Sequence, residues 1–319
     1  MTARLWVAWR LERTTLLIMG GLIAVFAAWL VVRGLHIHSI AQATRSCRRR
    51  PFTPACYPGQ FRIGSPTATA GPILANLLPL VGGMFVGAPM FARDFEAGTQ
   101  RFALTQGTGR IRWVVSRLAL TAAVCLPLAS LLGLLTWWWL APYRSAAFFG
   151  GGPWAGGRDL AIVTPVLLTG WTLLGLAVGV TIGLLLRRTL RAIAATGTLM
   201  AVLMVLAVSR LRPLLLGFDP LRVRNSSPLG TYTVATYFTG PNGRILSDAA
   251  LNQLVAHIPP KVAAANTELT WYAARHVYFW LAYQPASRYW LFQFTELGVL
   301  LVVSALLVVL TLRIARRAD

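Results

Sequence analysis

Few side chains in this sequence could do acid–base, metal or nucleophilic chemistry, and those present form no familiar catalytic set. The chain has four histidines, and none stands in the H-E-x-x-H arrangement that binds zinc on a helix. No G-x-S-x-G turn, which would expose a nucleophilic serine, occurs either. The sequence therefore favours a protein that has no catalytic site and holds no metal.

Energy from ATP would have to come from another polypeptide. A P-loop places a lysine beside the nucleotide phosphates, and the only lysine here, Lys261, stands in a Pro-Pro-Lys segment instead. We therefore expect that this chain binds no cofactor. If it takes part in driven transport, ATP and Mg²⁺ belong on a partner subunit.

One acid, Glu296, lies well inside a predicted membrane span, and Gln293 lies about one turn before it on the same face. Ionisable groups within a membrane are energetically costly, so a role in transport is the first hypothesis for these two residues. The alternative is structural. At a depth of roughly 10 Å from the exterior end, Glu296 could pair with Arg288 or Arg275.

Two of the three cysteines, Cys47 and Cys56, fall in the same predicted exterior loop. An oxidising compartment would allow a disulfide between them, and two free thiols are the alternative. Cys125 lies within a predicted span, where we expect it to pack as a small apolar residue.

The elements that must position these residues are membrane helices. Of 319 residues, 56% are hydrophobic and 12% charged, which is about half the charged share of a soluble domain. The net charge of +21 comes from arginines between apolar runs, which favours lipid head groups over nucleic acid. We predict an all-α integral membrane protein, one transmembrane domain over 1–319, with six spans long enough to cross a bilayer: 15–32, 71–92, 113–135, 160–186, 192–208 and 289–312. The fifth span is the shortest, and a longer form that extends into 211–216 is the alternative.

Arginine density predicts the orientation of these spans. The connections 1–14, 93–112, 187–191 and 313–319 are short and arginine-rich, whereas 33–70, 136–159 and 209–288 are longer and more dilute. The positive-inside rule then places both termini in the cytoplasm, although an Arg48–Arg50 cluster lies on the exterior side. The exterior segment 209–288 is too long for a plain connector, and we predict helices at 247–258 and 267–283 within it.

Three segments carry local signals of their own. Residues 1–14 interleave tryptophans with arginines, which predicts an amphipathic helix at the interface or, alternatively, an extension of the first span. Pro79 and Pro89 predict a kinked second span that could act as a hinge. The fourth span has three glycines at four-residue spacing, which lets helix backbones approach closely, within the chain or between two copies: Gly175, Gly179 and Gly183.

The connection 93–112 is the best candidate for contact with a soluble protein. We predict a short helix over 95–105 that ends near Gly107 and Gly109. These glycines do not form a nucleotide-binding fingerprint, because the third glycine and the preceding strand are missing. A solvated turn between two spans is the alternative.

Two motifs relate the chain to a known family. One is Phe91-Ala92-Arg93-Asp94-Phe95-Glu96-Ala97-Gly98-Thr99, continued by Leu104-Thr105-Gln106 and Arg110-Ile111-Arg112-Trp113. The other is Tyr-Gln-Pro-Ala-Ser-Arg-Tyr-Trp at 283–290, followed by Gln293 and Glu296. The first resembles the hallmark loop of bacterial ABC type-2 transporter permeases, actinobacterial members in particular. The second is similar to the start of the last span in the same group.

The resemblance implies the permease subunit of an ATP-driven exporter in a bacterial cell membrane. The apolar, aromatic exterior segment favours an amphiphilic substrate, such as a drug, antibiotic, lipid or peptide. It implies that 1–14 is an interfacial elbow helix and that 209–288 contains re-entrant helices. It also implies that 93–112 contains a coupling helix that docks on the ATPase. The residues at or near that contact would be Arg93, Asp94, Glu96, Gly98 and Thr99.

Six spans make half a transmembrane domain, so the resemblance implies two permease copies, expected as a homodimer, with two ATPase subunits. The competing hypothesis is a non-transporting membrane scaffold that anchors a soluble partner through 93–112. An intramembrane enzyme is disfavoured by the missing catalytic sets.

Overall fold

The computed structural model describes residues 2–43, 66–98, 110–145, 153–154, 164–225, 228, 230–264 and 268–317. Cys47, Cys56 and Thr99 lie outside these residues, so the predicted disulfide and the last residue of the predicted coupling set remain predictions. Within the described residues, six helical segments are long and apolar enough to cross a membrane, which confirms the six predicted spans. They are Glu12–Gln42, Ala70–Glu96, Ile111–Trp139, Pro165–Leu186, Thr189–Leu216 and Ala286–Arg316.

The first span is one continuous helix, α1, at Thr2–Ala43. The separate interfacial helix predicted for 1–14 is therefore wrong, and the alternative of an extended first span holds. No proline occurs in α1, and its first glycine is Gly20. Nothing therefore interrupts the backbone where the arginines give way to apolar residues.

The second span is broken into four helical pieces. These are α2 at Pro66–Asn76, α3 at Leu78–Gly82, the π-helix η4 at Gly83–Gly87, and α4 at Pro89–Glu96. Pro79 and Pro89 have no N–H to donate, and both lie in the first turn of a helical piece: Pro79 is the second residue of α3, and Pro89 is the first residue of α4. Between them the Ala88 N–H donates to the Gly83 carbonyl, five residues back, at 2.8 Å. A π-turn of this kind inserts an extra residue and bends the helix.

The other spans are more regular. α6 covers Arg110–Trp139 and is followed by the short α7 at Ala141–Ser145. α8, at Pro165–Leu186, begins where the Thr164 hydroxyl accepts the Leu167 N–H at 3.2 Å. The fifth span joins α9, η7 and α10, at Thr189–Leu206, Ala207–Leu211 and Arg212–Leu216, so the alternative that extends into 211–216 holds. The sixth consists of η8 at Ala286–Arg288 and α14 at Tyr289–Arg317.

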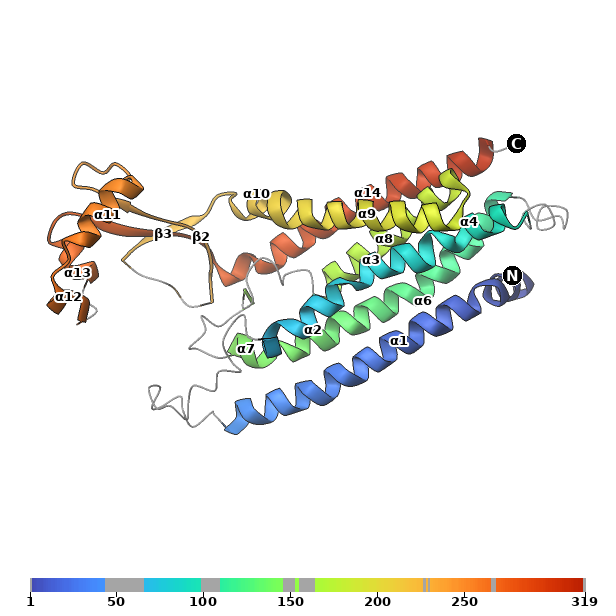
Figure 1. The fold of residues 1–319 in the computed structure, drawn as a ribbon, viewed down its shortest axis with the longest axis horizontal. Helices are drawn as coiled ribbons and strands as arrows, with labels where there is room; N and C mark the ends of the chain where they lie inside the picture. The colour runs from blue at the N-terminus through green and yellow to red at the C-terminus, as the bar shows by residue number, and fades with distance from the viewer. Residues whose placement is uncertain are drawn as a thin grey trace.

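α8 is the centre of the bundle. In its most apolar stretch 78% of the residues are buried, against 17% in the first and sixth spans. It packs against the second span, α6, α9 and α14. Both chain termini lie at one end of the bundle, called the terminal end below (Figure 1).

A small α/β unit, called the sheet module below, lies beyond the opposite end (Figure 1). Its strands are β1 at Leu221–Arg224, β2 at Tyr232–Thr239 and β3 at Tyr278–Gln284, antiparallel in the order β1-β3-β2. Its helices are α11 at Asp248–Ala256, α12 at Pro260–Ala264 and α13 at Glu268–Ala273. The protein is mostly helical, and this module is where it departs from the predicted all-α fold.

The two helices predicted in this region have different outcomes. The helix predicted at 247–258 is confirmed as α11, and the Ser247 hydroxyl accepts the Ala250 N–H at 3.3 Å. The helix predicted at 267–283 is wrong, because α13 ends at Ala273 and residues Tyr278–Gln284 form the central strand. His276 takes a left-handed conformation, with φ of 56°, and the aromatic residues after it suit a strand.

Candidate functional site

Three charged side chains join three helices at the terminal end, and we call Glu12, Asp94 and Arg117 the terminal clasp. Arg117 of α6 donates from Nε to Glu12 Oε1 of α1 at 3.0 Å. Its two Nη atoms form ion pairs with Glu12 and with Asp94 of α4. The side chains of Arg117 and Glu12 are 4% and 3% exposed, and that of Asp94 is 17% exposed. The clasp is therefore buried except at its Asp94 edge.

Aromatic rings enclose the Arg117 guanidinium. Its Cζ lies 5.1 Å from the ring centres of both Phe91 and Trp113, and these two rings meet edge to face. A planar guanidinium can bind two carboxylates while it lies over an aromatic face, which an ammonium group does less well. The rings and carboxylates together fix the end of α4 against α1 and α6.

The last turn of α4 also contacts the tight turn between α8 and α9. Glu96 Oε2 accepts the Thr189 N–H at 3.0 Å, at the start of α9. The Phe95 ring lies under the Arg187 guanidinium, 5.2 Å from its centre. The end of α4 thus touches α1, α6 and the α8–α9 turn, which makes it the meeting point of the helices at the terminal end.

The residues predicted to couple the chain to an ATPase lie at or just after this end of α4, and three of them contact other parts of the chain. Asp94 and Glu96 bind groups of their own chain, and Arg93 donates to the Thr15 hydroxyl at 3.5 Å. Gly98, with φ of +67°, follows the end of α4. The helix predicted to begin at residue 95 is therefore wrong at its start, because residues 97 and 98 form a turn.

A second buried ion pair joins Arg212 and Glu296, and Trp171 binds the same carboxylate. We call these three residues the sheet-end joint. Arg212 of α10 donates from Nε and Nη2 to the two carboxylate oxygens of Glu296 on α14, at 3.0 and 2.9 Å. The Trp171 indole N–H of α8 donates to the same carboxylate at 3.0 Å. The side chains of Arg212 and Glu296 are 3% and 5% exposed. The joint therefore ties three spans together inside the bundle.

The partner of Glu296 differs from the sequence prediction. We expected Arg288 or Arg275, but Arg288 pairs with Asp219 at 3.3 Å and Arg275 lies over the Trp271 ring. Arg212 was assigned to the exterior segment, whereas α10 continues the fifth span and carries Arg212 into the bundle. Gln293 lies next to the joint, and its Oε1 accepts the Thr164 hydroxyl at 2.9 Å.

The three glycines of α8, Gly175, Gly179 and Gly183, pack against the part of the second span that was predicted to act as a hinge. We call this contact the glycine interlock. A Cβ added at Gly175, Gly179 or Gly183 would lie 2.3 Å from a backbone carbonyl oxygen of the second span. Those oxygens belong, in the same order, to Pro79, Gly83 and Ala88. The two helices therefore touch backbone to backbone within one chain, on either side of the π-turn.

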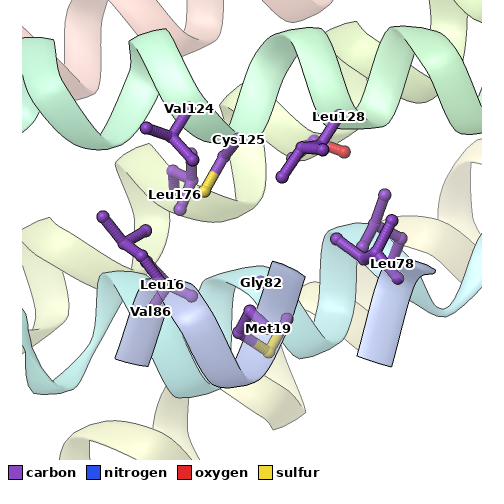
Figure 2. A pocket seen from close by; sticks show the side chains of 11 residues that line it. Leu16, Met19, Leu78, Gly82, Val86, Val124, Cys125, Leu128 and Leu176 are labelled. Carbon is purple, nitrogen blue, oxygen red and sulfur yellow. The ribbon is translucent and has the colours of Figure 1, made fainter. Parts of the chain in front are cut away.

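Two small cavities lie beside these contacts. Figure 2 shows an apolar one between α1, the second span, α6 and α8, with Leu16, Met19, Val86, Cys125 and Leu176 around it. Its volume is about 20 Å³, and a cavity next to Arg212 and Glu296 has the same volume. Each has room for one water-sized group. Neither could hold an amphiphilic substrate.

Sequence reasoning missed four residues of these joints: Glu12, Arg117, Trp171 and Arg212. Arg117 lies four residues after the start of a predicted span, and a charge there signals a buried partner without identifying it. Among the described residues, no group of three or more His, Cys, Asp or Glu could hold a metal ion.

Comparison with known families gives one match. A family model described as "ABC-2 membrane transporter related" matches residues 20–212, which is more than half of the chain. The matched range contains the glycine interlock, Asp94, Arg117 and Arg212, and it ends before the sheet module and α14. No curated protein and no solved structure matches the chain.

Proposed function

The chain belongs to the ABC-2 membrane transporter related family, and we propose that it is the permease subunit of an ATP-binding cassette exporter. In this proposal both termini lie in the cytoplasm of a bacterial cell. The ATPase subunit binds the terminal end through 93–112, with Arg93, Asp94, Glu96, Gly98 and Thr99 at or near the contact. The chain contributes no nucleotide site, which agrees with the absence of a P-loop lysine.

The observation that carries the proposal is the convergence of contacts on the end of α4. A displacement of the segment that follows Glu96 acts on α6 and α1 through Arg117, and on the α8–α9 turn through Thr189. A plain loop between two spans would need no such bracing. A segment that receives force from an ATPase would need it, because a flexible attachment would absorb the movement.

The same contacts provide a route from the terminal end to the sheet end. α4 continues into the π-turn, and the glycine interlock joins that turn to α8. α8 in turn carries Trp171, which binds Glu296 and so links α8 to α14 and α10. We propose that Pro79 and Pro89 bound the flexing part of the second span, and that the interlock passes its movement to α8.

The substrate path is proposed to lie between two copies of the chain. The cavities described within one copy have volumes of about 20 Å³, so an amphiphile such as a drug, antibiotic, lipid or peptide does not fit there. A homodimer with two ATPase subunits would form a larger cleft between the permeases. The Trp171–Arg212–Glu296 joint is then a structural element of each half. In this proposal Gln293 and Glu296 affect transport because they hold the membrane helices in position.

Co-purification with the ATPase tests this proposal. The tagged full chain is expressed with a candidate ABC ATPase from the same genome, and bound ATPase and ATPase stimulation are measured in the wild type and in Glu96→Arg. We expect both to fall severalfold. Asp248→Arg, an equal charge change on an exposed residue of the sheet module, should change neither. Unchanged binding and stimulation in a folded Glu96→Arg protein would contradict the proposed docking segment.

A second measurement separates an exporter from a scaffold. Vesicles that contain both subunits are loaded with a fluorescent amphiphile, such as a rhodamine dye or a labelled phospholipid. An exporter moves at least one such compound when ATP is added. A scaffold retains the ATPase and moves none.

A further inference from the structure

The turn between α8 and α9 combines exposed arginines with exposed leucines. We define the turn patch as Leu185, Leu186, Arg187, Arg188, Leu190 and Arg191. All three arginines are exposed, and Leu190 is 80% exposed. Leu185 and Leu186 are also exposed, at the end of α8. The patch therefore presents charge and apolar surface side by side, without a covering segment among the described residues.

The patch is held close to the membrane boundary by the geometry of the turn. α8 ends at Leu186 and α9 begins at Thr189, so only two residues separate two membrane spans. Arg187 takes a left-handed conformation, with φ of 52°, and its N–H donates to the Gly183 carbonyl at 3.1 Å. A turn this short cannot extend away from the bilayer. Its leucines therefore lie at the level of the acyl chains, and its arginines at the level of the head groups.

Two of the arginines form no ion pair among the described residues, although the charge of Arg188 acts on the nearby Glu96 carboxylate. Arg187 lies over the Phe95 ring, and the Thr189 N–H is already bound by Glu96. Arg188 and Arg191 form no ion pair with any side chain that the structure describes. Guanidinium groups bind phosphate through paired N–H donors, which makes phosphate the anion that fits two neighbouring arginines.

We propose that the turn patch binds the phosphate of an anionic phospholipid, such as phosphatidylglycerol, in the leaflet at the terminal end. Arg188 and Arg191 hold the phosphate, and the exposed leucines contact the acyl chains. A lipid fits the patch better than a docked protein does, because the leucines face the bilayer and the two-residue turn is too short to project into the aqueous phase. The turn patch contacts the proposed 93–112 docking segment through Phe95 and Glu96 but has no residue in common with it, and the inference stands whether or not the chain transports a substrate.

Native mass spectrometry of the purified full chain tests the proposal. The protein in detergent is titrated with phosphatidylglycerol or with phosphatidylcholine of the same acyl chains. We expect one phosphatidylglycerol to bind at least tenfold more tightly than phosphatidylcholine. The double variant Arg188→Gln with Arg191→Gln should lose about tenfold in phosphatidylglycerol affinity. Soluble glycerol phosphate, which has the head-group anion without acyl chains, should not displace the lipid at equal concentration.

The matched control removes two other exposed arginines at the same end, through Arg313→Gln with Arg316→Gln on α14. It lowers the net charge equally and should change affinity less than about twofold, because general electrostatic attraction is only part of the binding. Equal losses in the two double variants would contradict the proposal, as would equal affinity for the two lipids. Displacement by glycerol phosphate would show a free-anion site instead.

Two further measurements separate lipid binding from misfolding and from ATPase binding. Arg188→Lys with Arg191→Lys retains both charges, so it should keep most of the lipid affinity even if the glutamine variant folds poorly. Bound ATPase is measured in parallel. A glutamine variant that loses the ATPase and keeps the lipid would identify the patch as an ATPase contact and overturn the lipid assignment.

Discussion

The terminal clasp and the sheet-end joint both bury an arginine, yet they differ in exposure and in the number of carboxylates that the arginine binds. In the sheet-end joint one arginine meets one carboxylate, both Glu296 oxygens accept from Arg212, and Trp171 adds a third donor. In the clasp one arginine meets two carboxylates, and one of these, Asp94, is partly exposed. The joint is therefore closed to solvent, whereas the clasp is open to solvent at its Asp94 edge.

This difference indicates which end of the bundle can rearrange. If Glu296 separates from Arg212, its buried carboxylate keeps the Trp171 N–H as a donor and loses the opposite charge, so separation is strongly unfavourable. Asp94 can exchange Arg117 for water at a smaller energetic penalty, because its side chain already reaches the surface. The contact that can open thus lies beside the proposed ATPase segment, and the fixed contact lies at the opposite end.

The largest effect should come from breaking the sheet-end joint. Arg212→Met leaves the Glu296 carboxylate buried with Trp171 as its remaining donor. We expect a loss of about 3–5 kcal/mol in the free energy of unfolding, measured by denaturation in detergent. Arg210→Met removes an exposed arginine two residues earlier and should change stability by less than about 0.5 kcal/mol.

The neutral double variant Arg212→Met with Glu296→Leu sharpens this test. It removes both charges from the same place, and replacing a whole buried pair by apolar residues is often close to neutral. It should regain most of the stability that the single variant loses. If the single and double variants were equally unstable, lost packing rather than the unpaired carboxylate would explain the effect.

Breaking the terminal clasp should have a smaller effect. Arg117→Met fills the space between Phe91 and Trp113 with a side chain that packs well on aromatic rings. It leaves Glu12 buried, but Asp94 can turn toward water. We expect a loss of about 2–4 kcal/mol, with Arg112→Met, an exposed arginine of the same helix, as the control. If Arg117→Met lost more unfolding free energy than Arg212→Met, the terminal clasp and not the sheet-end joint would be the more tightly fixed contact.

Local patterns in the sequence were enough to predict the helices, but the charged joints depend on distant pairs. The six spans follow from apolar runs, and α11 follows from Ser247 before a helical pattern. Arg212 and Glu296 are 84 positions apart, and Glu12 and Arg117 are 105 apart. A sequence shows that such a charge needs a partner without showing which one the fold supplies.

The wrongly predicted helix at 267–283 has a related cause. Its aromatic residues fit a helix or a strand equally well when only neighbours along the chain are considered. Their conformation is decided by pairing with β1 and β2, which lie more than 30 residues earlier. The π-turn could likewise not be placed, although Pro79 and Pro89 predicted that the span would bend.

The glycine interlock connects the two charged joints, and a single methyl group tests it. In Gly179→Ala the new Cβ would lie 2.3 Å from the Gly83 oxygen and 2.7 Å from the Ala88 nitrogen. Backbone atoms cannot avoid the new methyl group by a change of rotamer, so α8 and the second span must move apart. We expect a loss of about 1–3 kcal/mol in unfolding free energy. Gly298→Ala, where nothing lies within 4 Å of the new Cβ, should be neutral or slightly stabilising.

The interlock variant also distinguishes a mechanical link from simple packing. If the interlock passes movement from α4 to α8, Gly179→Ala should retain ATPase binding while it lowers substrate transport per ATP hydrolysed. Reduced stability with normal transport per ATP would limit the interlock to a packing role. The wild type and Gly298→Ala are compared under the same conditions.

The smallest effect is expected at an exposed ion pair, Arg288–Asp219, which extends the comparison to the surface. The Asp219 side chain is 73% exposed, and Arg288 also donates to the Asp219 backbone carbonyl at 2.6 Å. Asp219 has a φ of 45°, a conformation that asparagine adopts readily and alanine does not. Asp219→Asn should therefore change the unfolding free energy by less than about 0.5 kcal/mol, whereas Asp219→Ala should lose about 1 kcal/mol through its backbone. Equal losses in the two variants would mean that the side-chain charge matters even at this exposure, and burial would then not explain the difference between the clasp and the joint.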